Sequence, residues 1–169
     1  TKHTASAFTA CAGTSDTIIC AGGQGNGNDK HNEKHAFATD VFVLNATSGG
    51  ILSHDVDYKL SVGRKKLSAA AQQDVIGFGL GYSDVSNTEG YSDQFDLYNT
   101  TSKRWFASGV VPSKEARQYA TAVGCGGKIL FAGGQVAGGR SAAVDIYDVS
   151  RKTWTNMMLS VARSNLAAA

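Results

Sequence analysis

The chain has 169 residues, of which 42% are hydrophobic, and its 16 Lys and Arg nearly balance its 14 Asp and Glu. This length is enough for one domain with a hydrophobic core. The balanced charge, without a basic stripe that alternates with aromatic residues, argues against nucleic-acid binding. No run of 18 or more apolar residues occurs, so a membrane-spanning helix is not expected.

The first copy of a repeated pattern begins near the N-terminus. An apolar run at 17–21 ends in the adjacent glycines Gly22 and Gly23, and Leu44 and Ile51 follow, seven residues apart. Such short runs, bounded by Gly, Asn and Ser, are typical of β-strands. A glycine pair allows two backbones to approach closely, because glycine has no Cβ and reaches positive φ easily. The pair therefore predicts a crowded strand end.

The second copy has the same order with two changes. The run at 75–81 carries alternating glycines, so that Gly79 stands where we expect the glycine pair. Tyr98 and Trp105 take the positions of the two apolar residues, again seven apart. Each has a large apolar ring with one polar atom, which suits a buried seam where that atom finds a partner. We expect both rings to be core rather than ligand platforms.

The third copy is the clearest. The run at 129–132 ends in Gly133 and Gly134, and Tyr147 and Trp154 follow with the same spacing of seven. These two aromatic residues are likewise predicted to lie in the core. Each copy is followed by an arginine that opens an alanine-rich run, and this arginine recurs at intervals of 53 and 46 residues.

The order of glycine pair, tyrosine and tryptophan, together with the recurring arginine, resembles the kelch repeat, whose period is about 50 residues. The resemblance implies an all-β fold of kelch-type β-propeller blades, each a four-stranded antiparallel sheet, in an incomplete ring. The chain is then a single partial propeller, 1–169. Its predicted parts are blade 1 at about 4–63, blade 2 at about 64–116, blade 3 at about 117–162 and the start of a fourth blade at 163–169.

An incomplete ring has two open ends, whereas closed propellers have about four to eight blades. Open sheet edges invite pairing or aggregation. Two alternatives follow from this. The chain is part of a longer propeller, which we favour because the sequence stops inside the first strand of a fourth copy, or two copies associate to close one ring.

Cys11 and Cys20 flank the predicted turn 13–16 and are placed to face each other across a hairpin. With three cysteines in total, no disulfide framework is indicated, so we expect two small buried thiols. The alternative, a disulfide bond, requires an oxidising compartment. The sequence does not decide the compartment; an intracellular location is slightly favoured, and secretion is the alternative.

Asn45 and Asn99 each begin an Asn-x-Thr sequence in corresponding turns of successive copies. Such sequences accept N-linked glycans in secreted proteins, and both turns are expected to be exposed. Asn and Thr are also common turn residues. Glycosylation and a purely structural role are therefore both open at these two sites.

The sequence carries no pattern typical of an enzyme. The glycine-rich run 22–27 is not followed by a helix pattern, so a phosphate site at a helix N-terminus is not expected. His31 and His35 lie four apart in the polar run 25–39, where a solvated insertion is favoured over a metal site. We therefore expect no catalytic residue, no metal site and no cofactor.

The loop after each glycine strand differs most between the copies. It spans 24–39, 82–90 and 135–141 in the three copies. Insertions of different length at one repeated position often mark the binding face of a repeat protein. Within these loops, Tyr82 and Arg140 are of the residue types that most often dominate protein interfaces.

The connection that opens each blade supplies basic residues, and the resemblance implies that it lies on the same face as these loops. The candidate binding residues of these connections are Arg64, Lys65, Lys66, Arg117, Gln118 and Arg163. Repeated around a ring, their positive charges would attract an acidic protein or peptide. The alternative is that the arginines have structural partners inside the repeat.

The kelch resemblance implies a non-catalytic scaffold that mediates protein–protein interaction through these inter-blade and inter-strand loops. Its expected partners are a protein or peptide ligand, preferentially acidic, and further blades from the same chain or a second copy. Neither nucleic acid nor a membrane is expected as a partner. Two alternatives are a kelch-type enzyme, galactose-oxidase-like or sialic-acid mutarotase-like, and a secreted glycosylated adhesive propeller. The copper site of the oxidase requires clustered Tyr, His and Cys, and no such set is visible.

Overall fold

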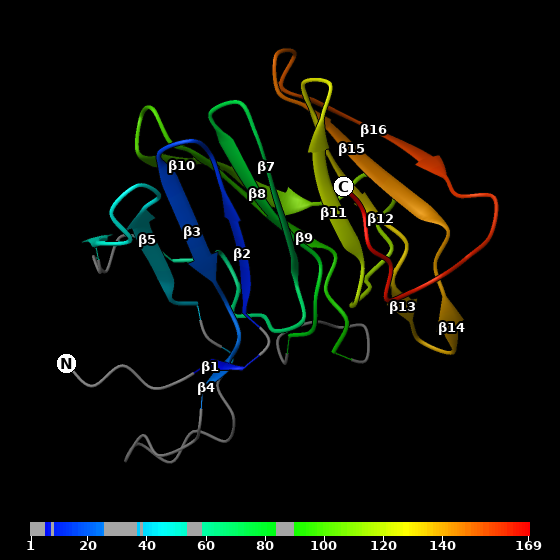
Figure 1. Cartoon of the computed structure of the whole chain (residues 1–169). Helices are drawn as coiled ribbons and strands as arrows, with labels where there is room; N and C mark the ends of the chain where they lie inside the picture. Colours follow the sequence, from blue (N-terminus) through cyan, green and yellow to red (C-terminus); the bar gives the residue numbers. More distant parts are fainter. Residues whose placement is uncertain (1–5, 8, 26–36, 38, 54–58, 84–89) are drawn as a thin grey trace.

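The computed structural model describes residues 6–7, 9–25, 37, 39–53, 59–83 and 90–169. This described part of the chain is all-β, as predicted. It contains no helix that is long and apolar enough to cross a membrane. Three four-stranded antiparallel sheets lie side by side, with the strands of each sheet in chain order (Figure 1).

The three sheets are the blades of the fold, and their strands are short. Blade 1 consists of β2 (Ala10–Gly13), β3 (Thr17–Ala21), β5 (Val41–Asn45) and β6 (Ile51–Ser53). Blade 2 consists of β7 (Ser68–Gln72), β8 (Val75–Gly79), β9 (Gln94–Asn99) and β10 (Arg104–Val110). Blade 3 consists of β11 (Thr121–Cys125), β12 (Lys128–Ala132), β15 (Ala143–Asp148) and β16 (Thr153–Met158). Two small pairs join β1 (Ser6–Ala7) to β4 (Gln24–Gly25) and β13 (Gln135–Val136) to β14 (Gly139–Arg140).

The first strand of each blade lies closest to the neighbouring blades. β2 lies against β7, and β7 lies against β11, so these three innermost strands follow one another around a common axis (Figure 1). The fourth strands, β6, β10 and β16, form the opposite edges of the sheets. The described strands of each blade fall within the predicted blade limits, which themselves stay a prediction.

The spacing of seven residues has a simple origin in strand register. Two residues that flank a tight β-hairpin at this spacing directly oppose each other, so their side chains lie on the same face of the sheet. The directly opposed pairs are Leu44 with Ile51, Tyr98 with Trp105, and Tyr147 with Trp154. The rings of the two aromatic pairs are 5.3 and 5.1 Å apart.

Two apolar clusters fill the seams between the blades. Phe78 of blade 2 and Ile19 of blade 1, both fully buried, belong to the first cluster. Phe131 of blade 3 and Phe95 of blade 2 belong to the second, where the Trp154 ring lies 4.7 Å from that of Phe95. Each of blades 2 and 3 thus turns its aromatic face toward the preceding blade. The tyrosine and tryptophan of blades 2 and 3 lie in these seams.

The glycine pair connects each blade to the next one. In blades 1 and 3 both glycines have positive φ, for example 74° at Gly22 and 63° at Gly133. The amide of the second glycine donates to the carbonyl of the arginine that opens the next blade, at 2.7 Å from Gly23 N to Arg64 O. A Cβ at Gly22 would lie 2.5 Å from that carbonyl oxygen. Only glycine fits this junction without a shift of the backbone.

The structure corrects the prediction for Gly79. In blade 2 the positions of the pair are taken by Leu80, with φ of 65°, and by Gly81, whose amide donates to Arg117 O at 2.8 Å. Gly79 instead makes room for an aromatic ring of blade 3, because a Cβ there would lie 2.8 Å from the Phe131 ring. The alternating glycines therefore serve two different contacts.

Leu80 is fully buried although it has a positive φ. In blades 1 and 3 the corresponding residue is glycine, and a leucine of the following connection, Leu67 or Leu166, reaches to within 2.8 Å of the place of its missing Cβ. In the junction between blades 2 and 3, the following connection has Ala120 instead, which packs against the cluster that contains Leu80. Each junction therefore contains one leucine, supplied from one side or the other.

Cys11 and Cys20 form a disulfide bond between β2 and β3. The expectation of two separate thiols was therefore wrong. The two residues directly oppose each other in the strand register, with their Cα atoms 4.1 Å apart. Cys125 at the end of β11 is an exposed free cysteine.

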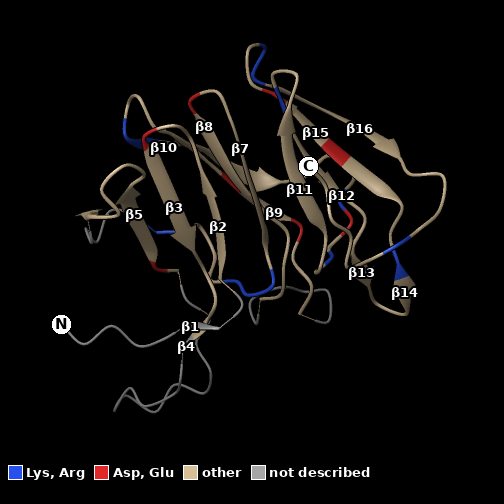
Figure 2. Ribbon diagram, in the orientation of Figure 1, with Lys and Arg blue, Asp and Glu red and all other residues tan. Residues whose placement is uncertain are grey.

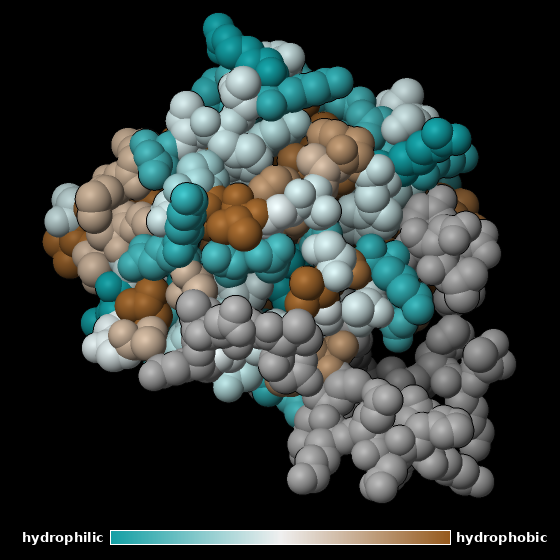
Figure 3. Space-filling view, turned by 180° about the vertical axis from the view of Figure 1, so that it is seen from behind, coloured by the Kyte–Doolittle hydropathy of each residue, from teal (hydrophilic) through white to brown (hydrophobic). Residues whose placement is uncertain are grey.

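Exposed large apolar side chains lie mainly on the outer strands. Among the described residues these are Ile51, Leu52, Phe106, Val110, Met157, Met158 and Val161. Seen from behind, the apolar residues form separate patches among hydrophilic ones rather than one continuous surface (Figure 3). The part of that face formed by the described residues therefore presents no single large apolar patch.

Candidate ligand-binding face around the axial cavity

A cavity of about 260 Å³ lies where the innermost strands begin, and we refer to it as the axial cavity. Its lining residues are Thr9, Lys66, Leu67, Tyr119, Ala120, Asn165 and Leu166. Two adjacent repeat positions supply most of them. The polar residues Lys66, Tyr119 and Asn165 follow the three opening arginines by two residues, and Leu67, Ala120 and Leu166 follow them by three. The cavity therefore combines an apolar and a polar set, each repeated from blade to blade.

The three polar residues share an unusual backbone conformation. φ is 55° at Lys66, 54° at Tyr119 and 55° at Asn165, in the left-handed region that bulky residues rarely adopt. Their backbones are joined in series, from Tyr119 N to Lys66 O at 3.4 Å and from Asn165 N to Tyr119 O at 3.2 Å. Such a conformation costs about 1–3 kcal/mol per residue and tends to cluster at ligand sites. This cluster lines the axial cavity.

Lysines and aromatic rings meet beside this cavity. Lys66 Nζ lies 4.7 Å from the centroid of the Tyr119 ring and 5.9 Å from that of Tyr82. Lys65 Nζ lies 5.4 Å from the Tyr82 centroid and 4.7 Å from that of Phe37. The negative face of an aromatic ring attracts a cation at these distances. The rings therefore hold two ammonium groups next to the cavity.

Tyr82 is at the centre of this cluster and is fixed from several sides. Its ring meets those of Tyr91 and Phe37 edge-on, at 6.0 and 5.9 Å. Its backbone exchanges two hydrogen bonds with Lys65, of 2.8 and 3.0 Å. Lys65 Nζ in turn donates to Gln24 Oε1 on β4, which follows the second strand of blade 1, at 2.8 Å. The cluster thus spans the junction between blades 1 and 2.

Known proteins share both the motif and the fold of this chain. Residues 116–158 match the Kelch motif. The chain folds into kelch-type β-propeller blades. A similar solved structure, titled "Structure of YjhT", has a TM-score of 0.63 and 18% sequence identity over 93% of this chain and 47% of that one. The chain thus spans about half the length of that protein, and at this identity the likeness shows the fold alone. No curated protein matches the sequence.

Two predicted binding residues lie inside the kelch blades. Arg64 and Arg117 are both 0% exposed. Arg64 forms an ion pair with Asp96, and Arg117 forms one with Asp145 at 2.5 Å. Burial lowers the pKa of the Arg64 guanidinium, and the Asp96 carboxylate opposes that shift. The expectation that these side chains line a positive funnel is corrected, since both have the structural partners that the alternative required.

The other predicted binding residues of the kelch blades are nearer to the surface. Lys66 is half-buried and lines the axial cavity, and the half-buried Tyr82 has its ring centroid 5.9 Å from Lys66 Nζ. Arg163 is exposed, and its Nε donates to Val161 O at 3.2 Å. Arg140 is exposed on β14. Figure 2 shows basic stretches before β7 and on β14, both toward the lower end of the blades. Whether these residues bind a ligand stays a prediction.

Several predicted features lie outside the described residues. These are His31, His35 and most of the loops 24–39 and 82–90. The third loop, 135–141, is described and forms the small hairpin of β13 and β14. Among the residues that are described, no group of three His, Cys, Asp or Glu is close enough to hold a metal ion.

Asn45 and Asn99 occupy one repeated position of the kelch blades, which in blade 3 is Asp148. Asn99 Oδ1 accepts a hydrogen bond from Ser102 N at 2.7 Å, and Asp148 Oδ1 accepts one from Arg151 N at 2.9 Å. Asn45 closes its turn in the same way. A side-chain oxygen that accepts from a nearby amide is a common turn device for Asn and Asp alike. The turn accounts for both asparagines, and their glycosylation stays a prediction.

Sequence reasoning missed Tyr119 and Asn165 as residues of the axial cavity. Neither belongs to a chemical motif, and in sequence Asn165 resembles any polar loop residue. The signal that identifies them is positional, since each follows an opening arginine by two residues, as Lys66 does.

Proposed function

We propose that the chain is a non-catalytic binding module that holds an acidic protein or peptide segment over the axial cavity. The observation that carries this proposal is the cluster of Lys65 and Lys66 with the rings of Tyr82 and Tyr119 beside that cavity. Tyrosine side chains on rigid elements are frequent anchors of protein interfaces. Ammonium groups next to them favour carboxylates through charge-assisted hydrogen bonds.

The composition of the cavity supports a peptide ligand with adjacent acidic and apolar residues. Leu67 and Leu166 offer apolar surface for one side chain, and Lys66 and Asn165 offer polar groups beside it. Ligand sites commonly combine an apolar lining with a few polar groups that fix orientation. A volume of about 260 Å³ is small, so it suits part of a peptide rather than a whole one.

The residue types around the cavity also favour binding over catalysis. Its described lining contains neither a histidine nor a carboxylate, the groups that most often transfer protons in enzymes. Variation of loop length at the repeated position after the glycine strands agrees with a binding face as well.

The test is a selection of random phage-displayed peptides against the full chain, followed by fluorescence anisotropy with synthetic peptides. We expect the selected peptides to be rich in Asp and Glu and their binding to weaken with salt. Lys66→Glu should weaken binding by about 10-fold or more, and Tyr82→Ala should also weaken it. Both substitutions act on the cluster beside the cavity.

The matched control is Lys152→Glu, which makes the same change of charge in the exposed turn between β15 and β16. This turn lies at the end of blade 3 opposite to β13 and β14 (Figure 1). It should leave the affinity unchanged. Selected peptides without acidic residues, or an equal loss of affinity in the two lysine variants, would show that the proposed face is not the binding site.

A second candidate function, a secreted adhesive propeller, is favoured by one observation. The Cys11–Cys20 disulfide is the kind of bond that persists in oxidising compartments. N-linked glycans at Asn45 or Asn99 would accompany such a location. The intact mass of the protein from its source, before and after treatment with an N-glycosidase, tests this candidate. An unchanged mass would argue against it.

A further inference from the structure

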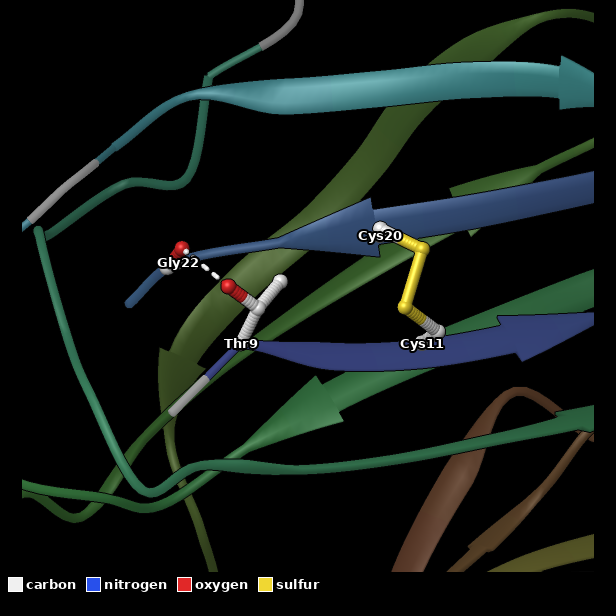
Figure 4. Close-up of a disulfide and its surroundings, with 4 residues drawn as sticks. All are labelled: Thr9, Cys11, Cys20 and Gly22. Atoms are coloured by element: carbon white, nitrogen blue, oxygen red, sulfur yellow. Dashed lines mark hydrogen bonds between the residues drawn. A yellow bond between two sulfur atoms is a disulfide. The ribbon is translucent and has the colours of Figure 1, made fainter. Parts of the chain in front are cut away.

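The disulfide joins the innermost strand of blade 1 to the second strand. Figure 4 shows the bond crossing between β2 and β3 from the directly opposed Cys11 and Cys20. Cys11 is exposed and Cys20 is half-buried. The bond is therefore accessible from the surface that the described residues form.

The same cross-strand position holds a different pair in the other two blades. Ala69 opposes Phe78 in blade 2, and Ala122 opposes Phe131 in blade 3. Each phenylalanine is 0% exposed and lies in the seam with the preceding blade. Cys20 takes the phenylalanine position in blade 1, two residues before the glycine pair. In blade 1 the disulfide bond therefore occupies the cross-strand position at which blades 2 and 3 have a buried phenylalanine ring.

Blade 1 also lacks the other anchors of the repeat. In the strand register, Phe42 opposes Cys20 as Asp96 opposes Phe78 and Asp145 opposes Phe131. Phe42 therefore occupies the position at which the two aspartates pair with the buried arginines. Leu44 and Ile51 replace the tyrosine and tryptophan, and Ile51 is 54% exposed. Among the described residues, this face of blade 1 therefore carries fewer of the buried anchors that blades 2 and 3 have.

β2 itself is weakly held by its side chains. Ala10 and Ala12 are half-buried against the cluster between blades 1 and 2, and Cys11 and Gly13 are exposed. Alanine and glycine are poor strand formers, and two methyl groups bury little apolar area. Among the described residues, the disulfide is thus the main side-chain link between β2 and the rest of its blade.

We propose that the Cys11–Cys20 disulfide is a redox-sensitive clasp, and that its reduction by a thiol releases β2 while blades 2 and 3 stay folded. Local opening with a free energy below that of global unfolding is common for elements with few buried contacts. This inference does not depend on the proposed function.

The reaction is thiol–disulfide exchange with two thiols or one dithiol. A thiolate attacks the exposed Cys11 Sγ, the sulfur–sulfur bond breaks, and Cys20 leaves as a thiolate that takes up a proton. A second thiolate attacks the mixed disulfide and releases Cys11 as a thiol. Two electrons and two protons pass to the protein, and the reductant becomes a disulfide.

Release of β2 would alter the axial cavity. Thr9 immediately precedes β2 and lines that cavity. Its Oγ1 donates to Gly22 O at 3.3 Å, which ties the start of β2 to the end of β3 (Figure 4). Movement of β2 would carry Thr9 away from the cavity and open one wall. The clasp therefore links the redox state of the surroundings to the shape of the cavity.

Hydrogen exchange of the full chain, followed by mass spectrometry with and without dithiothreitol, tests the proposal. Reduction is verified by alkylation of two additional thiols. We expect exchange across residues 10–21 to become roughly 10- to 100-fold faster, the size expected for opening a short disulfide loop. Exchange across 121–132 in blade 3 should change little. Unchanged exchange in β2 after verified reduction would overturn the proposal, and so would an equal loss of protection in all three blades.

Two variants make the interpretation independent of the reductant. Cys11→Ser/Cys20→Ser should exchange rapidly in β2 and no longer respond to dithiothreitol. Cys125→Ser removes the exposed free cysteine and should respond as the original chain does. A double-serine variant that protects β2 as well as the oxidised chain would also overturn the proposal. If the double variant does not fold, the proposal is tested by comparing hydrogen exchange of the Cys125→Ser variant with and without dithiothreitol.

Discussion

The two buried arginines occupy equivalent positions in blades 2 and 3, yet their surroundings differ. In blade 3, Arg117 uses all three nitrogens. Its Nε donates to Gly133 O at 2.8 Å. Its Nη1 donates to Ser113 Oγ at 2.9 Å and to Glu115 O at 3.0 Å, and its Nη2 lies 2.5 Å from Asp145 Oδ2. This guanidinium is therefore satisfied on every side.

In blade 2, Arg64 is paired with Asp96 through Nη2, but its Nε and Nη1 have no partner among the described residues. The preceding connection supplies the Nη1 partners in blade 3, whereas the Nε partner there is Gly133 O after β12. The two connections differ in length, which bears on Nη1. Ser61 and Ser113 both donate their amide to the paired carboxylate, at 3.0 and 2.8 Å. Ser61 precedes its arginine by three residues, however, and Ser113 by four. Blade 2 thus repeats the arginine–aspartate ion pair of blade 3 without the additional hydrogen bonds around the guanidinium. We expect the free energy of unfolding that each arginine contributes to increase with these hydrogen bonds.

The largest effect is expected from Arg117→Met. It should destabilise the chain by about 3–5 kcal/mol, because Asp145 becomes an unpaired buried charge. Arg64→Met should cost at least about 1 kcal/mol less, since it removes fewer hydrogen bonds and also two unsatisfied donors. Urea unfolding of both variants measures the difference. Equal losses in the two variants would contradict the comparison.

A control separates the lost hydrogen bonds from the unpaired carboxylate. Arg117→Met/Asp145→Leu removes both charges and should recover part of the stability that Arg117→Met loses, because no buried charge is left alone. A double variant that is less stable than Arg117→Met would show that the unpaired Asp145 carboxylate does not cause the stability loss of the single variant.

The second effect compares the tryptophans of the two seams. Trp154 lies close to three rings, those of Phe95, Phe131 and Tyr147. Among the described residues, Trp105 has two ring neighbours, and its buried Nε1 has no hydrogen-bond partner. Trp154→Ala should destabilise by about 3–4 kcal/mol and Trp105→Ala by about 1 kcal/mol less. Thermal unfolding provides the measurement, and a larger loss in Trp105→Ala would reverse the ranking of the seams.

The fold could be predicted from the sequence because its signals are local. The spacing from Tyr98 to Trp105 reflects a directly opposed pair in one hairpin, and Tyr147 with Trp154 repeats it. Such a pattern is set by strand register within a few residues, so it survives even where Leu44 and Ile51 replace the aromatic rings.

The errors arose where a residue responds to something distant in the sequence. Gly79 was assigned to the glycine pair, but its small size is required by Phe131 of the next blade. Arg64 is predicted at a binding surface, but it is buried because its guanidinium pairs with Asp96, which is 32 residues away in the sequence. The axial cavity depends on three such connections meeting at one axis, so Tyr119 stood out only through its repeated position.

The third effect concerns the junction after blade 2, where the leucine is Leu80 and the following connection has the smaller Ala120. Ala120→Leu should destabilise by about 1–3 kcal/mol, because Leu80 already fills this junction. Leu80→Gly/Ala120→Leu reproduces the arrangement of blades 1 and 3, in which Leu67 or Leu166 lies over a glycine. It should recover at least about 1 kcal/mol, since glycine also suits the positive φ at this position. If the loss of unfolding free energy in the double variant, measured by urea unfolding, equals the sum of the losses in the two single variants, the side chains at positions 80 and 120 do not compete for the same space.

The smallest effect concerns the turn of blade 3. The backbone amide of Arg151, the Ser150 hydroxyl and Lys128 hold the pKa of Asp148 well below its ordinary value. A depressed folded-state pKa stabilises above the unfolded-state pKa of about 3.9, and this stabilisation is lost as the pH falls toward the folded-state pKa. Asp148→Asn keeps the turn-closing oxygen, as Asn99 does in blade 2, but removes the charge. The original chain should therefore lose more stability than the variant as the pH falls from about 5 to about 2. Parallel pH profiles in thermal unfolding would show that Asp148 does not contribute to acid lability.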